Sequence, residues 1–365
     1  MITEKKTWAI GGGLLLIIAL TWLLRPIYDP DFFWHLKTGE WIWQNRAIPT
    51  SDPFSFTTPN PLLWPKLYTL NGYWLAQLTY SGFYELGGWW GIFVLRGLLV
   101  GSLLGLFLLF RQKDSLIWLC CAGLTSLLLL ESWPVERPQF ISFVLFAGLY
   151  LYLDRLFAEG RAVGFGGGIG AVLLMVVWAN VHGGIVLGQG LLGLAIIFAW
   201  WKFFLPGSQL HPIQQPTKLL VVGLFGLAAV MLTPNGIRLF SLLSEIAGKD
   251  QLFVAANAEY MSLFSLWKER SEPEFFGYVV CMVLAVVGVS RNFRNTHPFR
   301  FVVLVGTLVQ GLLAMRYMPF FLCAAVPAMT SALTGCLPGA VRVGRGLAVT
   351  LLLTGLLVLG WDEAG

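Results

Sequence analysis

Charged side chains are scarce in this chain. Lys, Arg, Asp and Glu together make up 12% of its 365 residues, against roughly 25% in a soluble domain. Hydrophobic residues account for 57% of the chain, and the mean hydropathy is +0.73. This composition excludes an ordinary soluble protein and predicts a polytopic membrane protein, because each span needs about 20 mostly apolar residues. The basic residues are dispersed between apolar runs, so we expect no nucleic-acid partner.

The cysteines give no sign of a metal site or another reactive site. The five cysteines lie in or beside apolar runs and lack the spacing of metal ligands, so we interpret them as small buried hydrophobes. Glycine runs such as Gly11–Gly13 and Gly166–Gly168 are not preceded by the strand that a nucleotide-binding loop requires. Inside apolar helices, such runs favour close helix packing. Nucleotide binding is therefore not expected.

Long apolar runs, by contrast, occupy almost the whole chain. Since Lys and Arg collect in short cytoplasmic loops, the runs predict about eleven spans in one transmembrane domain over residues 1–365, with the N-terminus in the cytoplasm. The expected spans are about 8–28, 88–110, 115–132, 139–154, two within 164–201 broken near 180–184, 218–233, one ending at Arg291, two flanking Met315–Pro319, and 347–361. Two large outer loops follow from this topology, at 29–87 and 236–272. The fold class is thus all-α.

The polar residues that interrupt the apolar pattern fall on the outer side in this topology. They are Asp29, Asp31, His35, Glu136, Arg137, Asn180, His182, Asn235, Glu259 and Arg316. Ionisable groups at a membrane boundary cost free energy to hold in place, so several on one face indicate a site. The pattern predicts one functional face.

The first outer loop carries the densest polar set. Asp29 or Asp31 can cap a helix over about 32–45, because an Asp side chain accepts hydrogen bonds from the first turn. Asp31 and His35 are four residues apart and share a helical face. We expect the apolar side of this helix to carry Phe32, Phe33, Leu36 and Trp43. Such a tryptophan-rich amphipathic helix is typical of a membrane interface. A second helix, about 73–86, leads through two glycines into the next span.

Several motifs in this loop and beyond it occur in the order found in a known group of proteins. They are Asp29-Pro-Asp-Phe-Phe-Trp-His35-Leu-Lys-Thr-Gly39, Ile48-Pro49, Asp52-Pro-Phe-Ser55, Trp74-Leu75, Leu86-Gly-Gly88, Arg137-Pro-Gln139, Trp178-Ala-Asn-Val-His-Gly183, Pro234-Asn-Gly236 and Arg316-Tyr-Met-Pro-Phe320. Over most of its length the chain resembles a group of bacterial polytopic proteins described as glycosyltransferase-like. That group is similar to the GT-C superfamily, which includes protein O-mannosyltransferases and the enzymes that add aminoarabinose to lipid A.

The resemblance implies a GT-C-like helical bundle in the bacterial inner membrane, with its active face in the periplasm. It implies a polyprenyl-phosphate-linked sugar or glycan as donor and a glycan, lipid or protein as acceptor. The acidic pair of the family's first outer loop maps onto Asp29 and Asp31. A second acidic or polar position maps onto the region of Glu136 and Arg137, although the spacing there departs from that of the mannosyltransferases.

Glycosyl transfer from a lipid phosphate needs a base for the acceptor's proton and cations for the departing phosphate. Asp31 is our first choice for the base, followed by Asp29. Arg316 and then Arg137 are the expected phosphate ligands, because guanidinium binds phosphate oxygens in bidentate fashion. The acidic pair with His35 could also hold a divalent cation such as Mg²⁺ or Mn²⁺.

Plainer roles exist for the same residues. The acidic pair could serve only as a helix cap, Asn180 and His182 could satisfy free backbone groups at a helix break, and the two arginines could reach for lipid headgroups. At the level of the protein, the alternatives to an enzyme are a non-catalytic flippase or carrier and an accessory subunit of lipid-linked glycan assembly.

Overall fold

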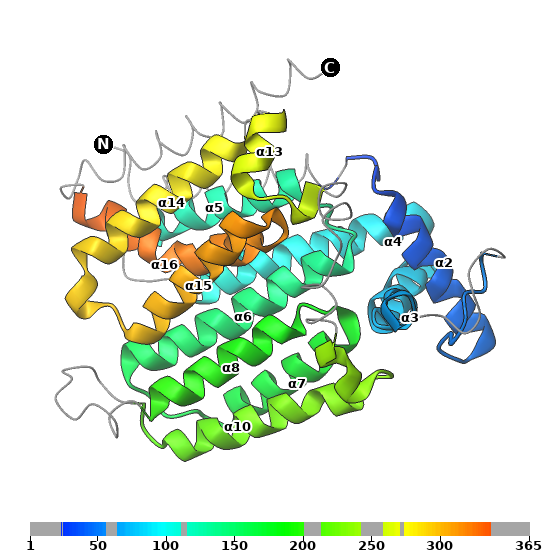
Figure 1. Ribbon diagram of the computed structural model, residues 1–365, viewed down its shortest axis with the longest axis horizontal. Coiled ribbons are helices and arrows are strands. Elements are labelled where there is room, and N and C mark those ends of the chain that lie inside the picture. The colour runs from blue at the N-terminus through cyan, green and yellow to red at the C-terminus, as the bar shows by residue number, and fades with distance from the viewer. Residues whose placement is uncertain are drawn as a thin grey trace. The chain divides into compact units, whose positions relative to one another are not determined.

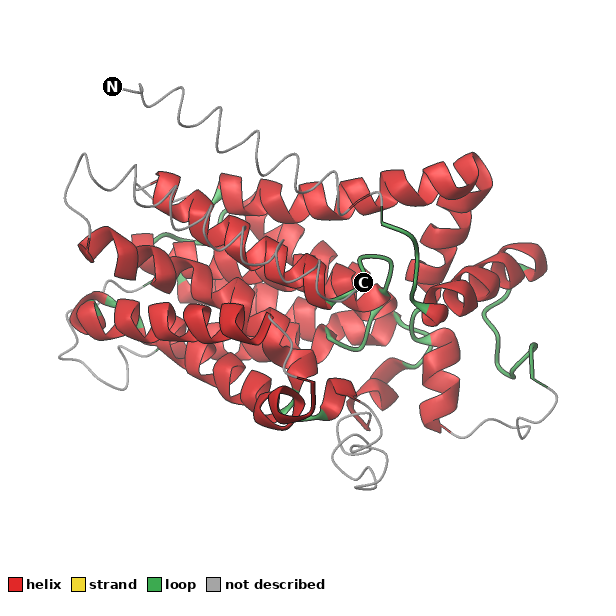
Figure 2. Cartoon of the chain, turned by 90° about the horizontal axis from the view of Figure 1, so that it is seen from above, coloured by secondary structure: helices red, strands yellow, loops and turns green. Residues whose placement is uncertain are grey.

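The computed structural model describes residues 23, 25–55, 64–110, 115–200, 213–241, 258–270 and 274–336. Every regular element in these residues is an α-helix or a short 3-10 helix (Figure 2). Four helices are long and apolar enough to cross a membrane, and five shorter apolar helices accompany them. An all-helical fold with candidate membrane spans is therefore confirmed for this part of the chain. The expected spans at about 8–28 and 347–361 fall largely or wholly outside it, as does much of the 236–272 loop.

The chain divides into two compact units. The first, here called the loop unit, consists of Ile27–Leu99 and Pro134–Gln251, and the second, the terminal unit, of Met1–Pro26, Val100–Trp133 and Leu252–Gly365. The boundary falls within α4 (Trp74–Leu109).

The loop unit contains most of the predicted polar residues. Its helices are α2 (Pro30–Asn45), α3 (Trp64–Asn71), the first part of α4, α6 (Pro138–Glu159), α7 (Phe165–Val181), α8 (Ile185–Ala199) and α10 (Pro216–Ala228), followed by the 3-10 turns η1 (Ala229–Leu232) and η2 (Gly236–Phe240). Helices α6, α7, α8 and α10 pack beside one another (Figure 1). The predicted helix break near 180–184 is confirmed, because α7 ends at Val181 and α8 begins at Ile185.

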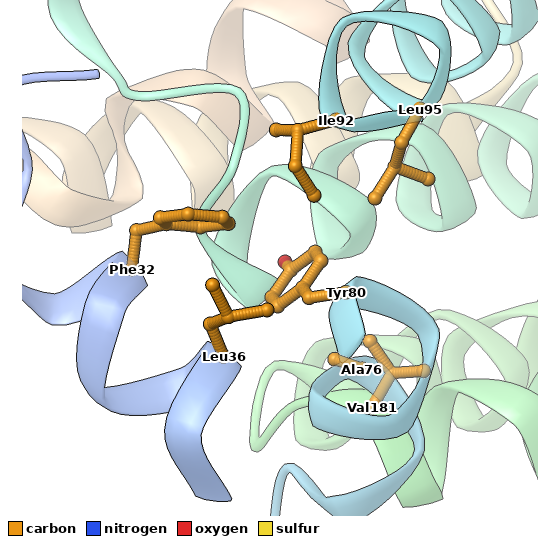
Figure 3. Packing of buried hydrophobic residues seen from close by; sticks show 7 residues of the cluster. All are labelled: Phe32, Leu36, Ala76, Tyr80, Ile92, Leu95 and Val181. Atoms are coloured by element: carbon orange, nitrogen blue, oxygen red, sulfur yellow. The ribbon is translucent and has the colours of Figure 1, made fainter. Parts of the chain in front are cut away.

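Helix α2 packs on α4 through a cluster of buried side chains. Figure 3 shows the cluster, formed by Phe32, Leu36, Ala76, Tyr80, Ile92, Leu95 and Val181. Gly39 allows the close approach, since a Cβ at this position would collide with the backbone carbonyl of Gln77. The expected apolar side of α2 was partly wrong: Phe33 and Trp43 are exposed, whereas the buried face includes His35, Thr38 and Gly39. The difference arises because α4 packs against a small and partly polar stripe, with Gly39 at the contact.

Helix α4 covers the predicted second interface helix and the predicted span, as two helical segments that meet at a kink. Gly88 interrupts its helical geometry with φ +57° and ψ −138°, a conformation that L side chains rarely adopt. The glycine thus provides the change of direction expected between residues 73–86 and the span that follows. Helix α3 was not predicted from the sequence.

The terminal unit has its own helical core. It contains α5 (Ser115–Ser132), α13 (Leu263–Arg270), α14 (Glu274–Arg291), α15 (Pro298–Leu313) and α16 (Met318–Cys336), with the 3-10 turns η3 (Ala258–Tyr260), η4 (Phe293–Asn295) and η5 (Met315–Tyr317). Helix α16 packs against α5, α14 and α15 (Figure 1). At Gly288 the α14 backbone meets the backbone of Ala328 so closely that a Cβ would not fit. Small residues thus set the helix contacts here too.

Candidate functional site

The first turn of α2 carries a carboxylate that is almost completely buried. Asp29 is the N-cap of α2, and its Oδ1 accepts from the backbone N–H of Asp31 at 3.4 Å. Arg137, the N-cap residue of α6, donates to Asp29 through Nε at 2.6 Å and through Nη2 at 2.8 Å. The Asp29 side chain is only 2% exposed. Asp29 therefore joins the start of α2 to the start of α6 through a bidentate ion pair.

Asp31 lies on the same guanidinium group but in a different environment. Its Oδ2 is 3.1 Å from Nη2 of Arg137, and its side chain is 63% exposed. The Arg137 side chain is 22% exposed. The structure thus brings both predicted carboxylates onto one cation, with Asp29 buried and Asp31 open to solvent.

A second ion pair is fully buried next to the first. Glu136 accepts from Arg96 of α4, at 3.0 Å from Nε and 2.7 Å from Nη2, and both side chains are at most 4% exposed. Consecutive residues 136 and 137 therefore bind α4 and α2, respectively. The partnership of Arg96 was not predicted, although a lone arginine in an apolar run signals a buried partner. This pairing makes Glu136 a structural anchor between α4 and the start of α6.

His35 lies on the buried face of α2. Its Nδ1 is 3.3 Å from Nε2 of Gln77, and its ring meets Tyr73 edge to face at 5.4 Å between centroids. Burial lowers the pKa of His35 from 6.5 to about 3, despite the opposing effect of Asp29. The imidazole is therefore neutral, and because the Gln77 amide donates to Nδ1, the ring proton is on Nε2. His35 and Asp31 come from the same α2 segment, but only Asp31 is exposed.

The break between α7 and α8 positions a second histidine. Nδ1 of His182 accepts from the backbone N–H of Gly184 at 3.0 Å and lies 2.8 Å from Oγ of Ser142. Because Nδ1 accepts from Gly184 and carries no proton, the Ser142 hydroxyl donates to it, and the same hydroxyl accepts from Nε1 of Trp178 at 2.7 Å. A chain of hydrogen bonds thus fixes His182 as the Nε2–H form. His182 thus satisfies one backbone group at the break, the Gly184 N–H, which is the plainer of the two roles considered for it.

Tyr73 connects the two histidines. Its ring stacks on His182 with 5.5 Å between centroids and a 19° interplanar angle. Its edge-to-face contact with His35 has a similar distance between centroids, 5.4 Å. Tyr73, Ser142 and Trp178 were not predicted from the sequence as members of this region. No spacing rule would select them, because their partners are distant in the chain.

Two predicted amides hold other elements of the loop unit. Oδ1 of Asn180 accepts from Nε1 of Trp74 at 2.7 Å, and its amide donates to the carbonyl of Val176. Asn235 donates to Oδ1 of Asn71 at 2.9 Å. Trp74 begins α4 and Asn71 ends α3, so both amides secure the segment that joins these helices.

The remaining predicted residues, Glu259 and Arg316, belong to the terminal unit. The Arg316 guanidinium lies over the Tyr260 ring at 4.4 Å from its centroid. Backbone N–H of Met315 donates to the carbonyl of Met261 at 2.9 Å, which joins η5 to the turn after η3. Arg316 is therefore held by the ring of Tyr260, the residue that follows Glu259 in the chain.

A divalent-cation site formed by the acidic pair and His35 was one possibility that the sequence left open. Among the described residues, no group of three or more His, Cys, Asp and Glu side chains could hold a metal ion. Both carboxylates of the pair face Arg137, and His35 faces Gln77. The side chains at this place do not fit a three-ligand cation site.

No protein-family model matches this chain, and no curated protein sequence is significantly similar to it.

Proposed function

We propose that this protein is a GT-C-type glycosyltransferase that transfers a sugar from a polyprenyl-phosphate-linked donor at the periplasmic face of a bacterial inner membrane. The single observation that carries the proposal is the cluster of Asp29, Asp31 and Arg137. It presents an exposed carboxylate and a guanidinium within 3.1 Å of each other at the N-termini of two helices. Acid–base work and phosphate binding are the two tasks that glycosyl transfer from a lipid phosphate requires.

The two carboxylates take different roles in this proposal. Asp29 has both oxygens on Arg137 and caps α2, so it positions the arginine and the helix. Asp31 makes its contact with Arg137 from an exposed position and can reach an acceptor hydroxyl. Asp31 is therefore the proposed general base, and Asp29 the positioning residue.

Arg137 is the proposed ligand of the donor phosphate in the loop unit. A phosphate that binds its guanidinium competes with Asp31, which makes the weaker contact of the two carboxylates. Loss of the cation favours proton uptake by Asp31. Donor binding would thus prepare the base. Arg316, held by Tyr260 in the terminal unit, is a second candidate phosphate ligand.

The test is transfer by the purified full chain in liposomes, supplied with radiolabelled polyprenyl-phosphate sugars extracted from bacterial membranes. We expect Asp31→Asn to lower the rate by about 10²–10⁴-fold, the usual contribution of a general base, with an unchanged melting midpoint. Asp29→Asn should lower both the rate and the midpoint, because it leaves Arg137 without its buried partner. Glu40→Gln, on the same helix in an exposed pair with Lys37, is the matched control.

An alternative function is favoured by a different observation. Arg96 on the apolar helix α4 forms a buried ion pair with Glu136, which lies in the turn before α6, and buried intramembrane charges are common in carriers. A carrier or accessory subunit would show no transfer by wild type, or full transfer by Asp31→Asn. Movement of a fluorescent polyprenyl-phosphate sugar across liposomes without transfer would identify the carrier.

A further inference from the structure

An apolar groove lies between α7 and α10 of the loop unit. Its volume is about 540 Å³, which is within the range of small-molecule sites. The side chains that form its walls include Val163, Phe165, Ile169, Leu173, Val221 and Phe225. Helices α7 and α10 run in the same direction, because Gly168 lies against Val222 and, further along both helices, Met175 lies against Gly226. Their N-termini therefore lie at the same end of the groove. Several of these side chains, including Phe165 and Phe225, are exposed.

The end of the groove at the helix N-termini is positively charged. Lys218 and Thr217 are its polar side chains, and no acidic residue is among the described ones that form the groove. The N-caps of α7 and α10, Gly164 and Gln215, make no side-chain capping hydrogen bond. The partial positive charge of both helix N-termini therefore adds to the charge of Lys218. The groove thus combines a long apolar wall with one cationic end.

We propose that this groove binds an anionic glycerophospholipid, with an acyl chain along α7 and α10 and the phosphate at Lys218. The apolar walls suit a hydrocarbon chain, and the charge at one end selects a negative headgroup. This site differs from that of the proposed sugar donor. Asn180 and His182 lie at the C-terminal end of α7, whereas Lys218 is at the end where α7 begins. The inference does not depend on glycosyl transfer.

The test is lipid binding by the full chain, delipidated in mild detergent and followed by native mass spectrometry. Phosphatidylglycerol and phosphatidylcholine with identical acyl chains are added in parallel, together with glycerol phosphate as a headgroup without a chain. We expect wild type to retain phosphatidylglycerol in preference to phosphatidylcholine. Glycerol phosphate should not displace it, because the acyl chain supplies much of the binding.

Two substitutions separate the charged end from the apolar wall. Lys218→Gln should lower phosphatidylglycerol affinity about fivefold, the effect of one lysine near an anionic lipid surface, while Lys218→Arg should preserve it. Leu173→Trp should reduce binding of both lipids by filling the groove. Leu224→Trp is the matched control, because Leu224 is exposed on α10 but does not form part of the groove.

Four results would overturn the proposal. They are equal retention of the two lipids by wild type, unchanged selectivity in Lys218→Gln, displacement by glycerol phosphate, and a loss in Leu224→Trp as large as in Leu173→Trp. A wild-type protein that binds no lipid but forms dimers that Leu173→Trp dissociates would assign the groove to a second copy of the chain instead.

Discussion

At the scale of single residues, His35 and His182 differ in a way that the sequence does not reveal. His35 is buried beside Gln77, whereas His182 accepts hydrogen bonds at a helix break. Burial lowers the pKa of His35 to about 3, below its value of 6.5 in an unfolded chain. The folded state therefore resists protonation, and acid favours the unfolded state, which takes up the proton.

This linkage predicts a stability loss that begins as the pH falls through 6.5 and continues to about 3. The expected loss is about 1.4 kcal/mol for each pH unit below 6.5. Melting midpoints at pH 7.5 and 5.5, in the same detergent, measure it. His35→Gln should have a smaller difference between the two midpoints than wild type, since glutamine does not titrate. An equal difference in both proteins would show that other groups dominate.

At the scale of elements, the contact between α2 and α4 depends on one glycine. A Cβ at Gly39 would collide with the Gln77 carbonyl, which belongs to the α4 backbone and cannot turn aside. Asp29 is the N-cap of α2, and Asp31 lies in its first turn. The position of the acidic pair thus depends on the packing of Gly39, further along the same helix, against α4.

We expect Gly39→Ala to lower the melting midpoint, since overpacking of a helix contact costs about 1–3 kcal/mol. Gly82→Ala is the control in the same pair of helices, because a Cβ at Gly82 meets no atom within 4 Å. It should stabilise α4 by about 0.5–1 kcal/mol through the helix preference of alanine. Equal midpoints for the two variants would contradict the close packing of α2 on α4.

At the scale of the whole molecule, the distribution of basic residues predicts which loops face outward. Asn45 ends α2 and should be outside, whereas Ala158 at the end of α6 should be inside; both are exposed. A membrane-impermeant maleimide should label Asn45→Cys in intact cells and Ala158→Cys only after the membrane is opened. Wild type, with its five native cysteines, gives the background. The reverse pattern would invert the proposed orientation.

Much of the helical order follows from the sequence because it depends on local properties. Apolar runs and breakers place α5, α6, α7 and α8 close to where they occur, and the Asp29 cap was foreseen as one of two choices. Helix α3 was missed. The apolar side of α2 was misjudged because burial depends on what α4 presents to it, rather than on the hydrophobicity of α2 alone.

The sequence by itself determined the helical class, the apolar spans and the residues that carry charge, because composition and short-range periodicity act along the chain. Only the tertiary structure decided how the charges pair. Asp29 and Asp31 are two residues apart, yet one is buried and the other exposed, and both contact Arg137, which lies 108 residues from Asp29 along the chain. Ion pairs between helices depend on distances in space, and a single sequence does not encode these at any fixed spacing.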